Sequence, residues 1–258
     1  MANIEVVTSF NKRLYDLSSK IMLDSYEKHV GDDISIHVYF EGDNPPVDNH
    51  NKVTWERYKD MKSIMSFHKM ADTRQNGLIQ KQTNGRYANG NMFRFDAKRF
   101  SWKGFALADH ALKRTDARYF VWLDADSQAN QEIDAEWITS MLKPGDLAAY
   151  LNRNNFETET GFLLFDREHP GYRKFWLYYK NLYYKKRLFN HQKWLDGYAF
   201  DLSRQFAESE GFTFSKLTDA FHPQAETHPW LASKLAERTM HFKGPSLKKE
   251  WTGTEHGE

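Results

Sequence analysis

Apolar and polar positions in the N-terminal part of the chain follow two different periodicities. Residues 4–10 and 34–40 are rich in β-branched and aromatic side chains, and each run ends in a polar, turn-forming segment, which is typical of β-strands. Between them, from Lys12 to Tyr26, apolar residues recur at three- and four-residue intervals, the spacing of an amphipathic helix. A strand, a helix and a second strand in this order predict a βαβ unit with parallel strands.

One of the most apolar runs of the chain, residues 119–123, follows a helix-like segment at residues 95–114 and ends abruptly at Asp124. Such a run predicts a strand buried on both faces, with Asp124 and Asp126 at its carboxyl end. In open α/β sheets, ligands bind in the crevice beyond the carboxyl ends of the strands. We therefore expect the two carboxylates to lie beside a ligand.

The rest of the chain predicts further elements of the same α/β class. Helices are expected over residues 55–71, 134–142, 170–189 and 192–210, and strands over residues 147–151, 160–165 and 212–214. Residues 73–91 are rich in Asn, Gln and Gly, and we expect a long loop there. Neither an internal repeat nor a low-complexity linker divides the chain, so we expect a single domain over residues 1–258.

The composition excludes some kinds of site and leaves others open. The 258 residues include no cysteine, which excludes disulfides and zinc–thiolate centres. The formal net charge of +1 gives the chain no overall attraction to nucleic acid or membranes. Because neither a signal peptide nor a membrane-spanning apolar run is recognisable, we expect a cytoplasmic protein, of a bacterium or, for a viral chain, of the host cell.

The pair Asp124 and Asp126 has two interpretations. Two carboxylates one residue apart can converge on one divalent cation, which then takes its other ligands from substrate phosphates. Aspartates after a strand also serve as turn formers or as caps of the next helix. The position directly after a buried strand favours the metal interpretation.

Two motifs carry a family resemblance. Residues 121–126, Val-Trp-Leu-Asp-Ala-Asp, resemble the Asp-x-Asp signature of GT-A fold glycosyltransferases. His241 and Gly244, with Lys248 beyond them, are similar to the His-x-x-Gly-x-x-Lys element of family 8 retaining members, except that Lys248 follows the glycine by four positions rather than three. The resemblance implies a single Rossmann-like domain with a mixed central sheet flanked by helices.

The same resemblance implies the activity and its cofactors. Residues 1–126 would form a nucleotide-binding half and residues 127–258 an acceptor-binding half. The reaction would move a sugar from a nucleotide-sugar donor, with UDP as the expected nucleotide, to a hydroxyl acceptor. Mn²⁺ or Mg²⁺ would be held by Asp124, Asp126 and His241.

Other residues are expected to contact the donor. Gly244 lets the backbone approach a phosphate, and Lys248, or Lys243, would donate to the leaving phosphates. At the end of the first strand, Thr8 would bond the edge of the nucleobase and Phe10 would stack on it. A strand end that simply needs polar groups explains Thr8 equally well.

Arg99 and Lys103 lie four positions apart on one helical face and would reach the donor sugar or diphosphate. A solvated helical face is the alternative for this pair. Glu159 and Asp196 are the candidate catalytic carboxylates, within segments that resemble the sugar-binding turns of the family. In an inverting enzyme one of them acts as general base, whereas in a retaining enzyme, which the late His-Gly element favours, Asp196 positions the donor sugar. Trp194 would be a sugar platform or a core residue.

Residues 172–194 contain seven Lys or Arg, nine aromatic residues and no acid. Basic residues interleaved with rings are typical of single-stranded or base-flipped nucleic-acid binding, so the acceptor could be a hydroxymethylated base as well as a glycan. An amphipathic helix that buries its rings is the alternative.

Two rival functions remain open. A sugar-phosphate nucleotidyltransferase also uses a metal and a carboxylate pair, but it carries a glycine-rich loop after the first strand, and residues 9–12 contain no glycine. A non-catalytic carbohydrate- or nucleic-acid-binding domain would use Asp124 and Asp126 only as caps.

Overall fold

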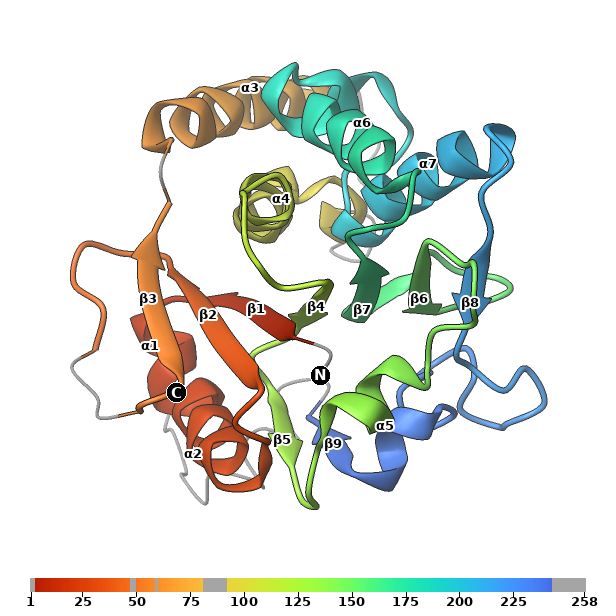
Figure 1. The fold of residues 1–258 in the computed structure, drawn as a ribbon. Helices are drawn as coiled ribbons and strands as arrows, with labels where there is room; N and C mark the ends of the chain where they lie inside the picture. The colour runs from red at the N-terminus through yellow and green to blue at the C-terminus, as the bar shows by residue number, and fades with distance from the viewer. Residues whose placement is uncertain (1–2, 47–49, 59, 81–91, 243–258) are drawn as a thin grey trace.

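A seven-stranded mixed sheet forms the centre of the computed structural model, which describes residues 3–46, 50–58, 60–80 and 92–242 (Figure 1). In spatial order the strands are β3 (Val53–Arg57), β2 (Ile34–Phe40), β1 (Ile4–Phe10), β4 (Tyr119–Leu123), β7 (Glu159–Asp166), β6 (Ala148–Leu151) and β8 (Phe214–Lys216). β3, β2, β1 and β4 are parallel, whereas β7 runs antiparallel to both β4 and β6. The α/β fold with a mixed sheet, expected from the sequence, is confirmed.

Helices cover both faces of the sheet (Figure 1). One face carries α3 (Met61–Gln80), α4 (Ala97–Ala111), α6 (Tyr172–Tyr184) and α7 (Asp196–Ser209). The other carries α1 (Lys12–Leu14), a π-helical turn (Tyr15–Ser19), α2 (Lys20–His29), α5 (Ala135–Thr139) and a small sheet of β5 (Ser127–Ala129) paired antiparallel with β9 (Thr239–His241). Short 3₁₀ helices lie at Met92–Phe95, Arg187–Asn190 and Lys234–Glu237.

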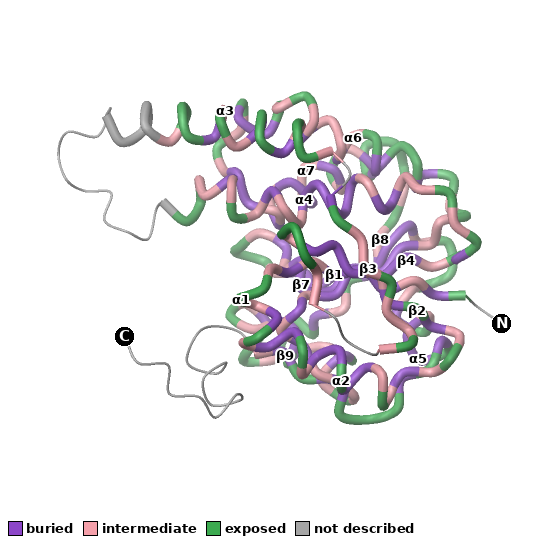
Figure 2. Tube along the Cα trace, turned by 90° about the vertical axis from the view of Figure 1, so that its left-hand side faces the viewer, coloured by how far each residue is buried: buried purple, intermediate pink, exposed green. Residues whose placement is uncertain are grey.

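The strands supply side chains to two cores, one on each face. Val7 and Trp122 pack toward α4 and α6, while Val6 and Val121 pack toward α2, as the alternation of a strand requires. Figure 2 shows the sheet as the buried centre, with helices that are buried on their inner side and exposed on the outer one. Among the described residues, no helix has both the length and the apolar character needed to cross a bilayer.

Several predicted boundaries are wrong. The helix predicted over residues 55–71 is a strand at Val53–Arg57, paired with β2, and then α3, which extends to Gln80 through part of the predicted loop at 73–91. Residues 81–91 lie outside the described chain. Trp55 explains the error, because it packs edge-on against Phe10 and Phe40 on the sheet rather than on a helical face.

The C-terminal part also differs in detail from the prediction. The strand expected at residues 212–214 lies at Phe214–Lys216, and the helix expected over 170–189 ends at Tyr184 before the 3₁₀ turn at Arg187–Asn190. Strands β5 and β9 were not predicted, because three-residue strands leave no measurable periodicity. Their pairing places Ser127, which directly follows Asp126, beside His241, one residue before the described chain ends.

Candidate active site

Asp124 is the first residue after β4 and is fixed by neighbours on both sides. Its backbone N–H donates to the Gly161 carbonyl in β7 at 2.8 Å, and the indole Nε1 of Trp122, a core residue with 1% exposure, donates to Asp124 Oδ1 at 2.8 Å. A carboxylate placed by the sheet and by a buried tryptophan is therefore held at the carboxyl end of the central strand. Its other oxygen, Oδ2, lies on the side of Gly161 that also faces His241.

The small β5–β9 sheet brings His241 to the aspartate pair. In this sheet Ser127 pairs with His241, and the Phe242 N–H donates to the Asp126 carbonyl at 2.9 Å. His241 Nε2 lies 3.2 Å from Asp126 Oδ1. One ligand atom from each of Asp124, Asp126 and His241 lies within 4.8 Å of the others. The structure thus gathers the three residues that the sequence predicts as metal ligands.

His241 is held from its far side by residues that the sequence reasoning missed. Its ring stacks on Trp230 with a centroid distance of 4.7 Å, and its Nδ1 lies 3.4 Å from His228 Nε2. The Trp230 indole in turn donates to Thr239 Oγ1 at 3.0 Å. A lone tryptophan and histidine in a turn-rich segment offer no sequence signal for this role.

Lys103 links the first carboxylate to a second one. From α4 its Nζ reaches Asp124 Oδ1 at 2.7 Å and Asp196 Oδ2 at 3.2 Å. The same ammonium donates to the carbonyl and the hydroxyl oxygen of Thr160, at 2.7 and 3.0 Å. Burial disfavours the charged form of Lys103, but the two carboxylates outweigh it and raise the pKa of Lys103 above 10.5. The predicted residues Lys103, Asp124 and Asp196 therefore form one buried charge network.

Asp196 occupies the first turn of α7, where a carboxylate interacts favourably with the helix dipole. Its Oδ2 accepts a hydrogen bond from Thr160 Oγ1 at 2.7 Å, and its Oδ1 one from the Gly197 N–H at 2.9 Å. A Cβ at position 197 would lie 2.4 Å from the Thr158 carbonyl oxygen, closer than any Cβ approaches backbone. The absence of a side chain at Gly197 therefore allows α7 to start beside β7 and to present Asp196 to Lys103.

The electrostatics of the cluster favour a cation. Burial raises the pKa of Asp124; the Lys103 ammonium opposes this, and the Asp126 carboxylate adds to it, leaving the pKa above its usual range. Burial lowers the pKa of His241, but the hydrogen bond and charge of Asp126 outweigh it and raise the pKa above 6.5. Two carboxylates forced together beside an imidazole are relieved by a divalent ion. The two carboxylates suit Mg²⁺ or Mn²⁺, and the imidazole nitrogen favours Mn²⁺ of the two.

Two predicted residues lie near this network without joining its centre. Glu159, at the start of β7, forms an ion pair with Arg153 at 2.9 Å and has 13% of its side chain exposed. Arg99 is exposed on α4 one turn before Lys103, with its guanidinium 5.4 and 5.7 Å from the ring centroids of Phe93 and Phe100. Arg99 therefore rests on aromatic rings rather than among the carboxylates.

The end of β1 does not agree with the predicted base-stacking role of Phe10. The Phe10 ring has 0% exposure and packs against Tyr15, Phe40 and Trp55, so neither face is left for a nucleobase. Thr8 is also fully buried, and its hydroxyl has no hydrogen-bond partner among the described residues. Gly244, Lys243 and Lys248 lie outside the described residues.

The aromatic residues of the 172–194 stretch belong mainly to the core. α6 buries Tyr172, Phe175, Trp176, Tyr179, Leu182 and Tyr183. Trp194, predicted as a sugar platform or a core residue, is 4% exposed and packs edge-on against Phe95 and Phe189. The amphipathic-helix interpretation is therefore correct, and within the described chain nothing supports a nucleic-acid-binding surface here.

Comparisons with known proteins support the fold and nothing finer. No protein-family model matches the chain, and no characterised protein matches it in sequence. Among solved structures it is similar to mouse xyloside xylosyltransferase 1 in the apo form, with 11% identity, 83% of this chain and 85% of that chain covered, and a TM-score of 0.46. It is also similar to the galactosyltransferase LgtC in complex with donor and acceptor sugar analogues, with 10% identity, coverage of 98% and 97%, and a TM-score of 0.48.

The fold comparison rests on a third structure, an active-site mutant of LgtC. It is 10% identical, covers 93% of this chain and 88% of that chain, and has a TM-score of 0.52. At this identity the likeness concerns the arrangement of strands and helices. The chain therefore has the GT-A type of α/β fold that its Asp-x-Asp motif predicts.

Proposed function

We propose that this chain is a metal-dependent glycosyltransferase that moves a sugar from a nucleotide-sugar, with UDP as the expected nucleotide, to a hydroxyl acceptor. The observation that carries the proposal is the convergence of Asp124, Asp126 and His241 within 4.8 Å of one another at the carboxyl end of β4. In an α/β sheet of this type, that edge is where a ligand binds.

Asp124, Asp126 and His241 would hold Mn²⁺ or Mg²⁺. Asp124 Oδ1 is already occupied by Lys103 and Trp122, which leaves Oδ2 for an ion. When bound, such an ion neutralises the negative charge that develops on a departing diphosphate. Asp126 and the His241 imidazole supply the remaining protein ligands, and Trp230 keeps the imidazole in position.

Lys103 and Asp196 would organise the sugar-binding side of the site. The Lys103 ammonium forms an ion pair with both Asp124 and Asp196 and so joins the metal side of the site to the sugar side. Asp196, delivered by the first turn of α7, would accept hydrogen bonds from the donor sugar in a retaining reaction. In an inverting reaction, Asp196 or Glu159 would act as general base on the acceptor hydroxyl.

We propose a glycan, rather than a hydroxymethylated base, as the acceptor. Basic residues interleaved with rings were the reason to consider nucleic acid, and most of the rings on α6 are buried, with Tyr178 and Tyr184 only partly exposed. The division into a nucleotide-binding half, residues 1–126, and an acceptor-binding half, residues 127–258, and the cytoplasmic location both stay predictions.

A donor-hydrolysis screen tests the proposal. UDP-, GDP- and CMP-sugars are incubated with the protein and Mn²⁺, and nucleotide release is measured for wild type, Asp126→Asn and Asp116→Asn. Asp116 is an exposed carboxylate before β4 and serves as the matched control. We expect release from one donor class that Asp126→Asn abolishes and Asp116→Asn preserves.

Two results would redirect the proposal. Equal turnover in Asp126→Asn and wild type would remove the metal-site chemistry. Pyrophosphate release from a nucleoside triphosphate and a sugar phosphate, without donor hydrolysis, would instead identify a sugar-phosphate nucleotidyltransferase.

A further inference from the structure

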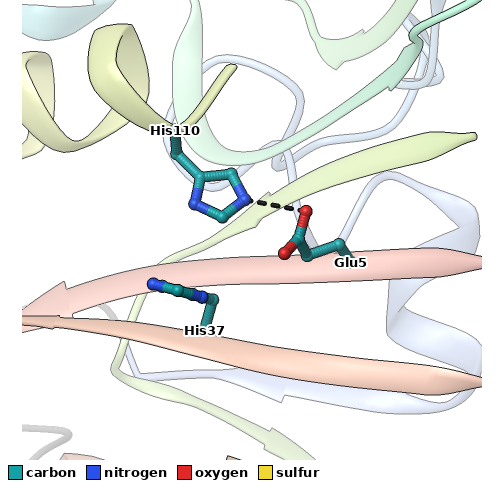
Figure 3. Close-up of side chains that lie close together, drawn as sticks. All are labelled: Glu5, His37 and His110. Atoms are coloured by element: carbon teal, nitrogen blue, oxygen red, sulfur yellow. Dashed lines mark ion pairs between the residues drawn. The ribbon is translucent and has the colours of Figure 1, made fainter. Parts of the chain in front are cut away.

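A second group of potential metal ligands lies between the sheet and α4, apart from the aspartate cluster. It consists of Glu5 on β1, His37 on β2 and His110 near the end of α4 (Figure 3). One ligand atom from each residue lies within 4.8 Å of the others. Glu5 stands near the amino end of β1, whereas ligands of the proposed active site gather beyond the carboxyl ends of the strands.

His110 presents a buried ring nitrogen to the carboxylate of Glu5. The side chain is 1% exposed, and its Nε2 points toward Glu5 with 2.9 Å between Nε2 and Oε2 (Figure 3). Two ligand atoms at this separation can be bridged by one ion with bonds of about 2.0–2.2 Å to each of them. The other ring nitrogen, Nδ1, lies 3.4 Å from the Tyr39 hydroxyl.

His37 has the environment of a supported metal ligand. Its Nε2 lies 2.8 Å from Glu56 Oε2, which leaves Nδ1 available to an ion. Metal-bound histidines commonly bond a carboxylate through the second ring nitrogen, which fixes the ring and its tautomer. The side chains of His37 and His110 are 14% and 1% exposed, and burial of this degree favours the neutral imidazole that coordination requires.

The charges around the cluster select the kind of ion. Arg167 Nη2 lies 3.1 Å from Glu5 Oε2, and the Lys113 ammonium contacts Glu56. The carboxylates of Glu5 and Glu56 therefore each have a cationic partner already. A hard ion such as Mg²⁺ or Ca²⁺, which binds where negative charge is in excess, would be held only weakly here. Two imidazoles and one carboxylate oxygen instead suit Zn²⁺, which forms strong bonds to nitrogen.

We propose that Glu5, His37 and His110 form a zinc site that ties α4 to β1 and β2. Three protein ligands of the types His, His and Glu are a known zinc donor set. The site would fix the end of the helix that, two turns earlier, delivers Lys103 to Asp124. The inference is independent of the proposed transfer reaction, because none of its three ligands belongs to that site.

Zinc binding to the full chain in the Asp126→Asn background tests the site, since this change weakens the other cluster. Purified protein is stripped with chelator and titrated with ZnCl₂, and stoichiometry and affinity are measured by isothermal titration calorimetry. His37→Gln and Glu5→Gln each remove one ligand. His68→Gln is the matched control, because His68 is a half-buried histidine of α3 that bonds Ser101 of α4, the helix that carries His110.

We expect one zinc per chain in the Asp126→Asn protein, with affinity reduced at least about tenfold by His37→Gln or Glu5→Gln and unchanged by His68→Gln. Cobalt in place of zinc should give visible absorption that the same two variants abolish. Circular dichroism establishes that each variant is folded, and if Glu5→Gln is not, His37→Gln alone decides. Absence of zinc binding, or an affinity unaffected by His37→Gln, overturns the proposal.

Discussion

Lys103→Met tests whether the buried charge network holds the candidate site together. The substitution keeps the length and the apolar stem of the side chain but removes the only ammonium that contacts Asp124 and Asp196 in the described chain. The side chains of Lys103 and Asp196 are 11% and 15% exposed. Removing one partner of a buried ion pair destabilises a protein by about 3–5 kcal/mol, because the other charge is left uncompensated.

The Asp124 side chain is 28% exposed, so we expect Lys103→Met to destabilise the protein by the lower end of that range, about 3 kcal/mol. For a chain of this size that corresponds to a fall in Tm of roughly 6–12 °C. Urea unfolding at pH 7 in chelator measures the free energy of unfolding of wild type, Lys103→Met, Asp124→Asn and the double variant. In the Asp124→Asn background the loss of Lys103 should cost clearly less, because one of the stranded carboxylates is then neutral.

A loss below about 1 kcal/mol for Lys103→Met would refute this reasoning, since it would equal that of an exposed pair. Additive effects of the two substitutions would refute it as well. Adding Mn²⁺ gives a further check, because an ion at Asp124 should restore part of the stability lost with Lys103.

The remaining predictions concern three other positions. Gly197→Ala should lower both thermal stability and turnover, because the added Cβ would lie 2.4 Å from the Thr158 carbonyl oxygen. Gly161→Ala is the control and should keep the wild-type Tm, because no atom lies closer than 3.5 Å to its Cβ. Equal Tm values for the two variants would contradict the packing argument. Burial raises the pKa of Glu41, which follows β2, to about 7, although hydrogen bonds from Ser9 and Asn11 act in the opposite direction. The protonated Glu41 therefore contributes its full stabilisation below about pH 4.5, and this contribution is lost as the pH rises through 7. Glu41→Gln should therefore gain stability relative to wild type by up to about 3 kcal/mol between pH 5 and 8, and parallel profiles of free energy against pH would exclude this. Phe10→Leu changes a core residue and should reduce the free energy of unfolding by about 1 kcal/mol while leaving the Kd for UDP unchanged. A large loss of UDP affinity in a folded Phe10→Leu variant would instead indicate that Phe10 stacks on the base.

Local sequence patterns were sufficient to predict the strands that matter most for the site. The run at Tyr119–Leu123 is apolar throughout and its end at Asp124 is abrupt, so both the strand and its carboxyl edge could be read directly. The βαβ unit of β1, α2 and β2 was also predictable, because its two periodicities are distinct. Edge strand β3 was not, since its half-buried residues fit a helical pattern as well as a strand.

The contacts that organise the site depend on tertiary packing and could not be predicted. Lys103 and Asp196 were singled out separately, for the donor and for the sugar, and only the packing of α4 and α7 against the sheet joins them. Phe10 shows the opposite error, because an aromatic residue at a strand end has the same sequence signature whether it faces a ligand or the core. His241 was found through a motif, whereas its support by Trp230 follows from the β5–β9 pairing that no periodicity reveals.

The most direct test of the metal site is isothermal titration of UDP into the protein with and without Mn²⁺, in wild type and in Asp126→Asn. We predict that UDP binds wild type in the presence of Mn²⁺, that binding weakens strongly in chelator, and that Asp126→Asn no longer responds to the metal. UDP binding of equal affinity in all of these conditions would contradict the assignment of Asp124, Asp126 and His241 as the ligands of a catalytic ion.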